Sequence, residues 1–144
     1  MKKALDEFAS IFSLTPSISI LDLNINNNDI TNKLNNLVEP VEGNITTVNT
    51  NIVKDCFRSI KRSNYDYGVV SNAFINSDDT QNLFKLVANG IRDSGHILII
   101  EEKSKDLNEI YELLEKYDFG AISQIDIFEN SNLIIGKKLH MWGM

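Results

Sequence analysis

A loop of asparagines at residues 24–28 is the first place where residue type and spacing could do chemistry. It follows an apolar segment, residues 18–23, with the pattern of a buried strand, and a helical pattern comes after it. A strand-to-helix turn near the start of an α/β domain often binds a nucleotide, because its backbone N–H groups point at the ligand. Glycines normally permit that close approach. This loop has none, so the sequence predicts the turn more strongly than it predicts ligand binding.

Two further positions could contact a ligand at such a turn. Asp22 precedes the loop, and its carboxylate would lie near a bound cofactor; alternatively it caps or orders the loop. Asn72, followed by Ala73 and Phe74, comes at the carboxyl end of another strand-like segment, where α/β proteins form ligand sites. The alternative for Asn72 is an ordinary connecting loop.

Charge and composition argue against other classes of partner. The 144 residues carry a formal net charge of −6, whereas nucleic-acid binding needs a concentrated basic surface. No apolar run approaches the roughly 20 residues of a membrane span. No group of His, Asp, Glu or Cys has metal-ligand spacing. We therefore expect no nucleic acid, no membrane and no metal, and a cytoplasmic location as the default.

One predicted helix, residues 52–62, contains both the only cysteine and the densest basic cluster. Its apolar stripe consists of Ile52, Val53, Cys56, Phe57 and Ile60, so we expect the Cys56 thiol to be buried and unreactive. The basic residues are interpreted as the solvated face of the same helix: Lys54, Arg58, Lys61 and Arg62.

Helical and strand patterns alternate along the rest of the chain. Helices are predicted at 2–13, 29–39, 52–62, 78–91 and 106–117, and strands at 17–23, 44–49, 65–72, 96–101, 121–128 and 132–140. Strands separated by helices pair in parallel through right-handed crossovers, whereas the last two, joined by a short turn, must be antiparallel. The prediction is a single α/β domain, residues 1–144: a three-layer sandwich with a mostly parallel Rossmann-like sheet and a C-terminal antiparallel hairpin.

This order of elements resembles the class I S-adenosylmethionine-dependent methyltransferases, over residues 17–140. Ser19-Ile20-Leu21-Asp22-Leu23 looks like the first strand of that family, and Tyr65-Asp66-Tyr67-Gly68-Val69-Val70 is similar to the strand that opens with an aromatic-aspartate pair. The segment from Gly90 to Glu101 resembles the glycine turn and strand after the fourth crossover helix. The resemblance implies S-adenosylmethionine as cofactor and Asp22, Asn24, Asn49 and Asn72 as its candidate binding residues.

The chain also departs from the family pattern. The family's first loop holds two or three glycines that contact the cofactor, and its second strand usually ends in an acid that accepts both ribose hydroxyls. This chain has asparagines in the loop and the neutral Asn49 after the second strand. Between Asn49 and Asp66 there is room for one helix only. Either a strand-helix unit is missing, or residues 45–48 are the third strand and the second has been lost.

These departures favour a degenerate methyltransferase-like domain without strong cofactor binding, which would act through an unknown protein partner or by self-association. An atypical but active methyltransferase with an unknown acceptor is the main alternative, and a sensor that binds a small ligand or nucleotide in the same crevice is a third. Methyl transfer from a sulfonium mainly needs alignment of the reacting atoms, so the lack of an obvious catalytic base does not decide between them.

Overall fold

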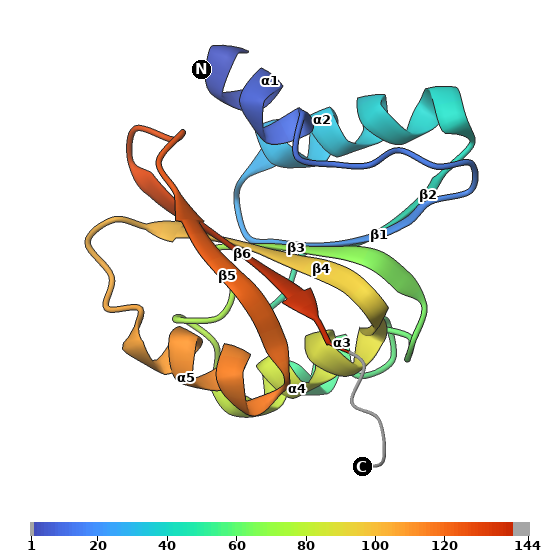
Figure 1. Ribbon diagram of the computed structural model, residues 1–144. Coiled ribbons are helices and arrows are strands. Elements are labelled where there is room, and N and C mark those ends of the chain that lie inside the picture. Colours follow the sequence, from blue (N-terminus) through green and yellow to red (C-terminus); the bar gives the residue numbers. More distant parts are fainter. Residues whose placement is uncertain (1, 140–144) are drawn as a thin grey trace.

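The computed structural model describes residues 2–139, which form a mixed six-stranded sheet covered by helices on both faces (Figure 1). The elements are α1 (Lys2–Ala9), β1 (Ser19–Asn24), α2 (Asn28–Val38), the 3-10 turn η1 (Glu39–Val41), β2 (Asn44–Val48), α3 (Val53–Cys56), β3 (Tyr65–Ser71), α4 (Thr80–Gly90), β4 (Ile91–Glu102), α5 (Asn108–Lys116), β5 (Phe119–Ile125) and β6 (Ser131–Lys138). Helices α1 and α2 lie on one face and α3, α4 and α5 on the other. This is the three-layer α/β sandwich that the sequence predicts.

The strand order is β2-β1-β3-β4-β6-β5. The first four strands pair in parallel, and β6 is antiparallel to both of its neighbours, β4 and β5. The predicted parallel sheet and C-terminal antiparallel hairpin are therefore confirmed. Because β2 pairs directly with β1, residues 44–48 take the place of the second strand, and no other described strand pairs with the outer edge of β2.

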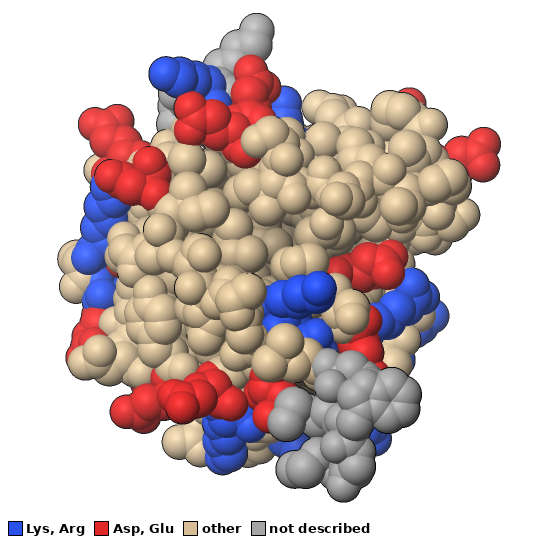
Figure 2. Space-filling view, in the orientation of Figure 1, with Lys and Arg blue, Asp and Glu red and all other residues tan. Residues whose placement is uncertain are grey.

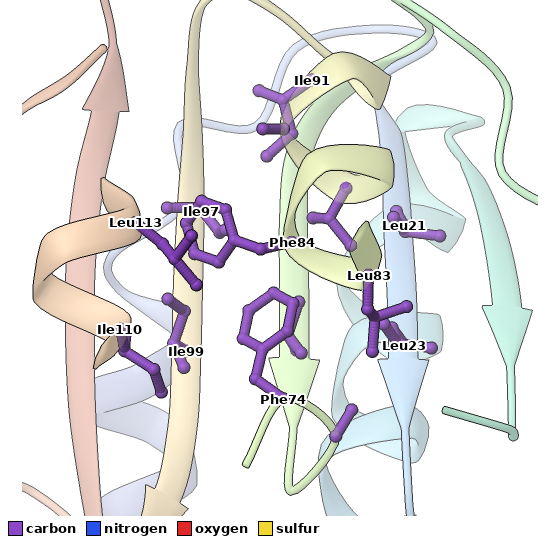
Figure 3. Close-up of a cluster of buried hydrophobic side chains, with 14 of the residues drawn as sticks. Leu21, Leu23, Phe74, Leu83, Phe84, Ile91, Ile97, Ile99, Ile110 and Leu113 are labelled. Carbon is purple, nitrogen blue, oxygen red and sulfur yellow. The ribbon is translucent and has the colours of Figure 1, made fainter. Parts of the chain in front are cut away.

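Alternating side chains divide the core between the two faces of the sheet. Ile18 and Ile20 pack under α1 and α2, whereas Leu21 and Leu23 point to the opposite face. On that second face the buried side chains of α4 and α5 meet the strands, with Phe84 in contact with Phe74 at 4.9 Å between ring centroids (Figure 3). Residues such as Leu21 are fully buried because helices cover both faces of these central strands.

The largest difference from the sequence prediction is in residues 52–60. Helix α3 has one turn only, and Ile52 and Phe57 are 48% and 69% exposed, although the sequence predicts both in a buried stripe. Cys56 and Ile60 are buried as expected. The helix is short because the chain must reach the end of α4, where the backbone N–H groups of residues 63 and 64 donate to Asn89 and Gly90.

Other boundaries shift by a few residues. Helix α1 ends at Ala9 rather than at 13, and α5 begins at Asn108. Strand β4 begins at Ile91, directly after α4, and not at 96 as predicted. The residues expected to form a glycine turn before this strand therefore lie inside it, where its pairing with β3 is irregular opposite residues 65–67. The last residue predicted for the final strand, 140, lies outside the described residues. Within residues 2–139 no helix is long and apolar enough to cross a bilayer.

Candidate functional site

A hollow of about 560 Å³ opens at the carboxyl ends of β1, β3 and β4. The connections from β1 and β3 diverge there, because β2 lies on one side of β1 and β3 on the other. Open α/β sheets bind ligands at such a point. The hollow is lined by residues from the loop after β1, the ends of β3 and β4, and the β5–β6 loop: Asn26, Asn27, Asn72, Glu102, Lys103, Ser104, Glu129, Asn130 and Ser131.

A second hollow, of about 520 Å³, adjoins the first beneath α1 and shares Asn27 and residues 129–131 with it. Apolar side chains, including Ile100 and Phe128, form part of its lining. Four acids also line it, Glu7, Asp29, Asp126 and Glu129, against one lysine, Lys3. An acidic lining favours cationic groups over anionic ones.

The side chain of Asn24 closes the loop between β1 and α2 on itself. Its Oδ1 accepts the backbone N–H of Asn27 at 2.8 Å, and its Nδ2 donates to the carbonyl oxygen of Asn27, also at 2.8 Å. The N–H of Ile25 donates to the carbonyl of Ser71 at 3.0 Å. Asn26 has φ 57°, the left-handed conformation that glycine normally supplies. The turn thus forms without glycine, and two of its N–H groups are engaged inside the protein.

Asp22 lies beneath this loop and is 0% exposed. Its carboxylate accepts hydrogen bonds from the Thr31 hydroxyl at 2.6 Å, from the Thr47 hydroxyl at 3.3 Å and from Asn24 Nδ2 at 3.4 Å. Burial raises the pKa of the Asp22 carboxyl, and these hydrogen bonds oppose the rise. The side chain therefore links β1, β2 and α2 and orders the base of the loop.

Asn72 is the candidate residue that lines the hollow. Its φ is 57°, its backbone N–H donates to Ile100 at 2.9 Å, and its Nδ2 donates to the carbonyl of Ile25 at 3.4 Å. The buried Oδ1 has no hydrogen-bond partner among residues 2–139. Asn49 is exposed directly after β2 and does not line this hollow. The fold thus gathers Asp22, Asn24 and Asn72 around one loop and leaves Asn49 outside it.

Glu101, near the end of β4, is a buried acid that the sequence analysis did not select. It is 1% exposed, and its carboxylate accepts the backbone N–H groups of Ile75 and Phe74. Burial raises the pKa of the Glu101 carboxyl to about 7, and Oε2 has no hydrogen-bond partner in the described part of the chain. Glu101 does not line the hollow, and its two bonds to residues 74 and 75 attach the end of β4 to the loop that carries Asn72. The feature of the sequence that could have identified Glu101 is its position, since it is an acid directly after the apolar run of residues 97–100.

Comparison with solved structures identifies the fold. An S-adenosylmethionine-dependent methyltransferase from Aquifex aeolicus superposes with a TM-score of 0.70 and 10% identity, over 94% of this chain and 89% of the other. Phosphoethanolamine N-methyltransferase 2 from Haemonchus contortus, solved with S-adenosylmethionine, superposes with a TM-score of 0.70 and 11% identity, over 96% of this chain and 53% of that enzyme. This chain has the class I methyltransferase fold.

A third structure with this fold comes from a complex of the Trm112 methyltransferase activator with a putative methyltransferase, from Haloferax volcanii. Its TM-score is 0.67 at 10% identity, over 95% of this chain and 90% of the other. No family model and no curated protein sequence matches this chain. At these identities the likeness establishes the methyltransferase fold, so the chemistry has to be argued from the residues at the site.

Proposed function

We propose that this domain uses the methyltransferase fold as a scaffold for protein interaction and does not bind S-adenosylmethionine strongly. The observation that carries the proposal is the closure of the first loop by Asn24. A loop that binds a cofactor needs free backbone N–H groups directed at the ligand. Here the N–H groups of Ile25 and Asn27 already have acceptors within the protein.

The residues around the loop support the same reading. The Asp22 carboxylate is buried under the loop, so it would have to leave three hydrogen bonds to reach a ligand. Asn49 offers one carbonyl acceptor and no charge at the position where the family usually has an acid. Neither side chain supplies a charged acceptor at the surface for the hydroxyls of a ribose.

One observation favours the alternative, an atypical active methyltransferase. The hollow of about 560 Å³ lies open at the carboxyl ends of β1, β3 and β4, and one of its lining residues is Asn72, whose buried Oδ1 has no hydrogen-bond partner among residues 2–139. Methyl transfer depends mainly on the alignment of donor and acceptor. An active enzyme would therefore need this hollow to bind the cofactor despite the closed loop.

The deciding experiment is the melting temperature with and without millimolar S-adenosylmethionine or S-adenosylhomocysteine. Ligand at about 100 times its dissociation constant stabilises a fold by about 2.7 kcal/mol, which is several degrees for a domain of this size. The proposal expects no shift with either compound. A clear shift would overturn it and support the enzyme.

An Asn24→Ala variant serves as the internal control for the closed loop. It removes both side-chain hydrogen bonds to Asn27 and leaves the strand in place. A ligand-induced shift in this variant but not in the natural chain would assign the loss of binding to Asn24. If the ligand raises the melting temperature of both the natural chain and the variant, the loop closure does not prevent binding.

A further inference from the structure

A groove of about 440 Å³ lies between residues 53–62 and α4, away from the hollows at the carboxyl ends of the strands. Its lining mixes apolar and basic side chains: Val53, Phe57, Ile60, Arg62, Asn82, Lys85, Leu86 and Asn89. Phe57, at its wall, is 69% exposed, and Ile52 next to α3 is 48% exposed. These are two of the five large hydrophobic side chains that the described residues expose. A solvent-exposed phenylalanine beside a groove is typical of a binding surface.

The surroundings of the groove are basic, although the chain as a whole carries a net charge of −6. Two basic residues, Arg62 and Lys85, line the groove, and three more belong to the same segment, residues 53–62, together with one acid, Asp55: Lys54, Arg58 and Lys61. None of the five forms a salt bridge with another described residue. The nearby Asp78 and Asp79 accept backbone N–H groups, from Val53 and Asn82 respectively. No carboxylate is among the described residues that line the groove, so its lining is complementary to an acidic partner.

The shape of the groove matches a helix. Along α4 its lining residues recur at helical spacing, Asn82, Lys85, Leu86 and Asn89, so they form one stripe parallel to the helix axis. Phe57 and Ile60 form the opposite wall. Leu86 is the apolar member of the α4 stripe, and the remaining apolar lining residues belong to the opposite wall. A groove with apolar side chains on both walls can bind the apolar face of an amphipathic helix.

A second copy of this chain is a poor source for that helix. The helix with the most acidic exposed face is α5, over which acidic side chains gather at the lower left of Figure 2. Its large apolar residues, Ile110, Leu113 and Leu114, are already buried against its own sheet. Helix α5 of a second copy therefore has no free apolar face to place in the groove. The helix that binds there must come from a protein in which such a face is exposed.

We propose that the groove between residues 53–62 and α4 docks an amphipathic, acid-flanked helix of a different protein, with Phe57 and Leu86 contacting its apolar face. The inference rests on the proposed interaction function and specifies the surface and the chemistry of the partner. The basic residues around the groove pair with Asp and Glu on the flanks of the bound helix.

The test uses a fluorescently labelled synthetic helix of about 18 residues. The acidic peptide has leucine at positions i, i+3, i+4 and i+7 and glutamate at the remaining positions. The basic peptide is the same sequence with lysine in place of every glutamate. Fluorescence anisotropy should show saturable binding of the acidic peptide and much weaker binding of the basic one. We expect Phe57→Ser and Lys85→Glu each to weaken binding about tenfold or more.

Matched control variants are Leu14→Ser and Lys116→Glu, which alter an exposed hydrophobic residue and an exposed lysine outside the groove. They should bind the acidic peptide as the natural chain does. Phe57 is largely exposed, so the melting temperature of Phe57→Ser should stay close to that of the natural chain, which separates lost binding from lost folding.

Three results would overturn the inference: no saturable binding of the acidic peptide up to about 1 mM, equal binding of both peptides, or binding that Phe57→Ser leaves unchanged. Self-association that depends on Phe57, measured by sedimentation velocity, would also overturn it in favour of a second copy. A melting shift with S-adenosylmethionine would refute the proposed function without changing the peptide titration, so the two failures are distinguishable.

Discussion

At the residue scale, the buried Glu101 carboxyl makes the stability of the fold depend on pH. Its pKa rises from 4.5 to about 7 in the fold, so the stability that the protonated acid contributes is fully present below pH 4.5 and is lost as the pH rises through about 7. Glu101→Gln removes this titration. The free energy of unfolding of the natural chain should fall relative to the variant by about 2–3 kcal/mol between about pH 4.5 and 8.

Urea unfolding of both proteins over that pH range measures the difference. Other groups with shifted pKa values, such as Asp22 and His96, are present in both proteins, so their contributions cancel in the difference between the two unfolding free energies. A gap between the two proteins that stays constant with pH would contradict the assignment to Glu101.

Asn26 provides a second test at the residue scale, because its φ of 57° lies in the left-handed region. Asn26→Ala should lower the free energy of unfolding by about 1 kcal/mol, since alanine adopts this conformation less readily than asparagine. Asn26→Gly should preserve stability or slightly increase it. Chemical denaturation of the two variants checks this, and equal losses in both would point to a side-chain contact of Asn26 instead.

At the scale of the elements, Gly95 allows β4 to follow its irregular course beside β3. A Cβ atom at residue 95 would lie 2.8 Å from the carbonyl oxygen of Asp66 and 2.9 Å from that of Arg92. Because backbone atoms cannot rotate away, Gly95→Ala should cost about 2 kcal/mol or more of unfolding free energy. Gly136→Ala in β6 is the control, since its closest neighbour would be 3.3 Å away. Similar losses for both variants in urea unfolding would show that the close approach at Gly95 is not decisive.

At the scale of the whole molecule, β2 is the edge of the parallel part of the sheet and is mostly exposed or half-buried, whereas β3 is almost entirely buried. Local opening should therefore release the amides of β2 well before those of β3 and β4. Hydrogen exchange followed by NMR measures this order. If the β2 amides exchange as slowly as those of β3, the edge opens only with the whole fold.

The alternation of strand and helix patterns was sufficient to predict the layers and the antiparallel hairpin, because apolar periodicity records which face is buried. It failed at Phe57, whose spacing is helical but whose helix ends one residue earlier to let the chain meet the end of α4. That constraint comes from contacts with residues 89 and 90, distant in sequence.

At the candidate site the family resemblance grouped four residues, Asp22, Asn24, Asn49 and Asn72. Three of them lie around one loop because parallel strands end at the same edge of the sheet, whereas Asn49 is exposed after β2 and does not line the hollow. The sequence could not foresee that Asn24 bonds to Asn27, which depends on the torsion angles of the loop. Glu101 was missed because an acid at the end of a strand is ordinarily solvated, and only the packing of residues 74 and 75 over it reveals its burial.

The position of β6 dictates an order of events while the chain is being synthesised. The ribosome releases β5 before β6, yet β5 pairs only with β6 among the described strands, and β6 in turn pairs with β4. When β5 has left the ribosome but β6 has not, β4 therefore has an unpaired apolar edge, which includes Ile97 and Ile99. Until β6 inserts between its two neighbours, that edge is open to chaperones and to other unfinished chains.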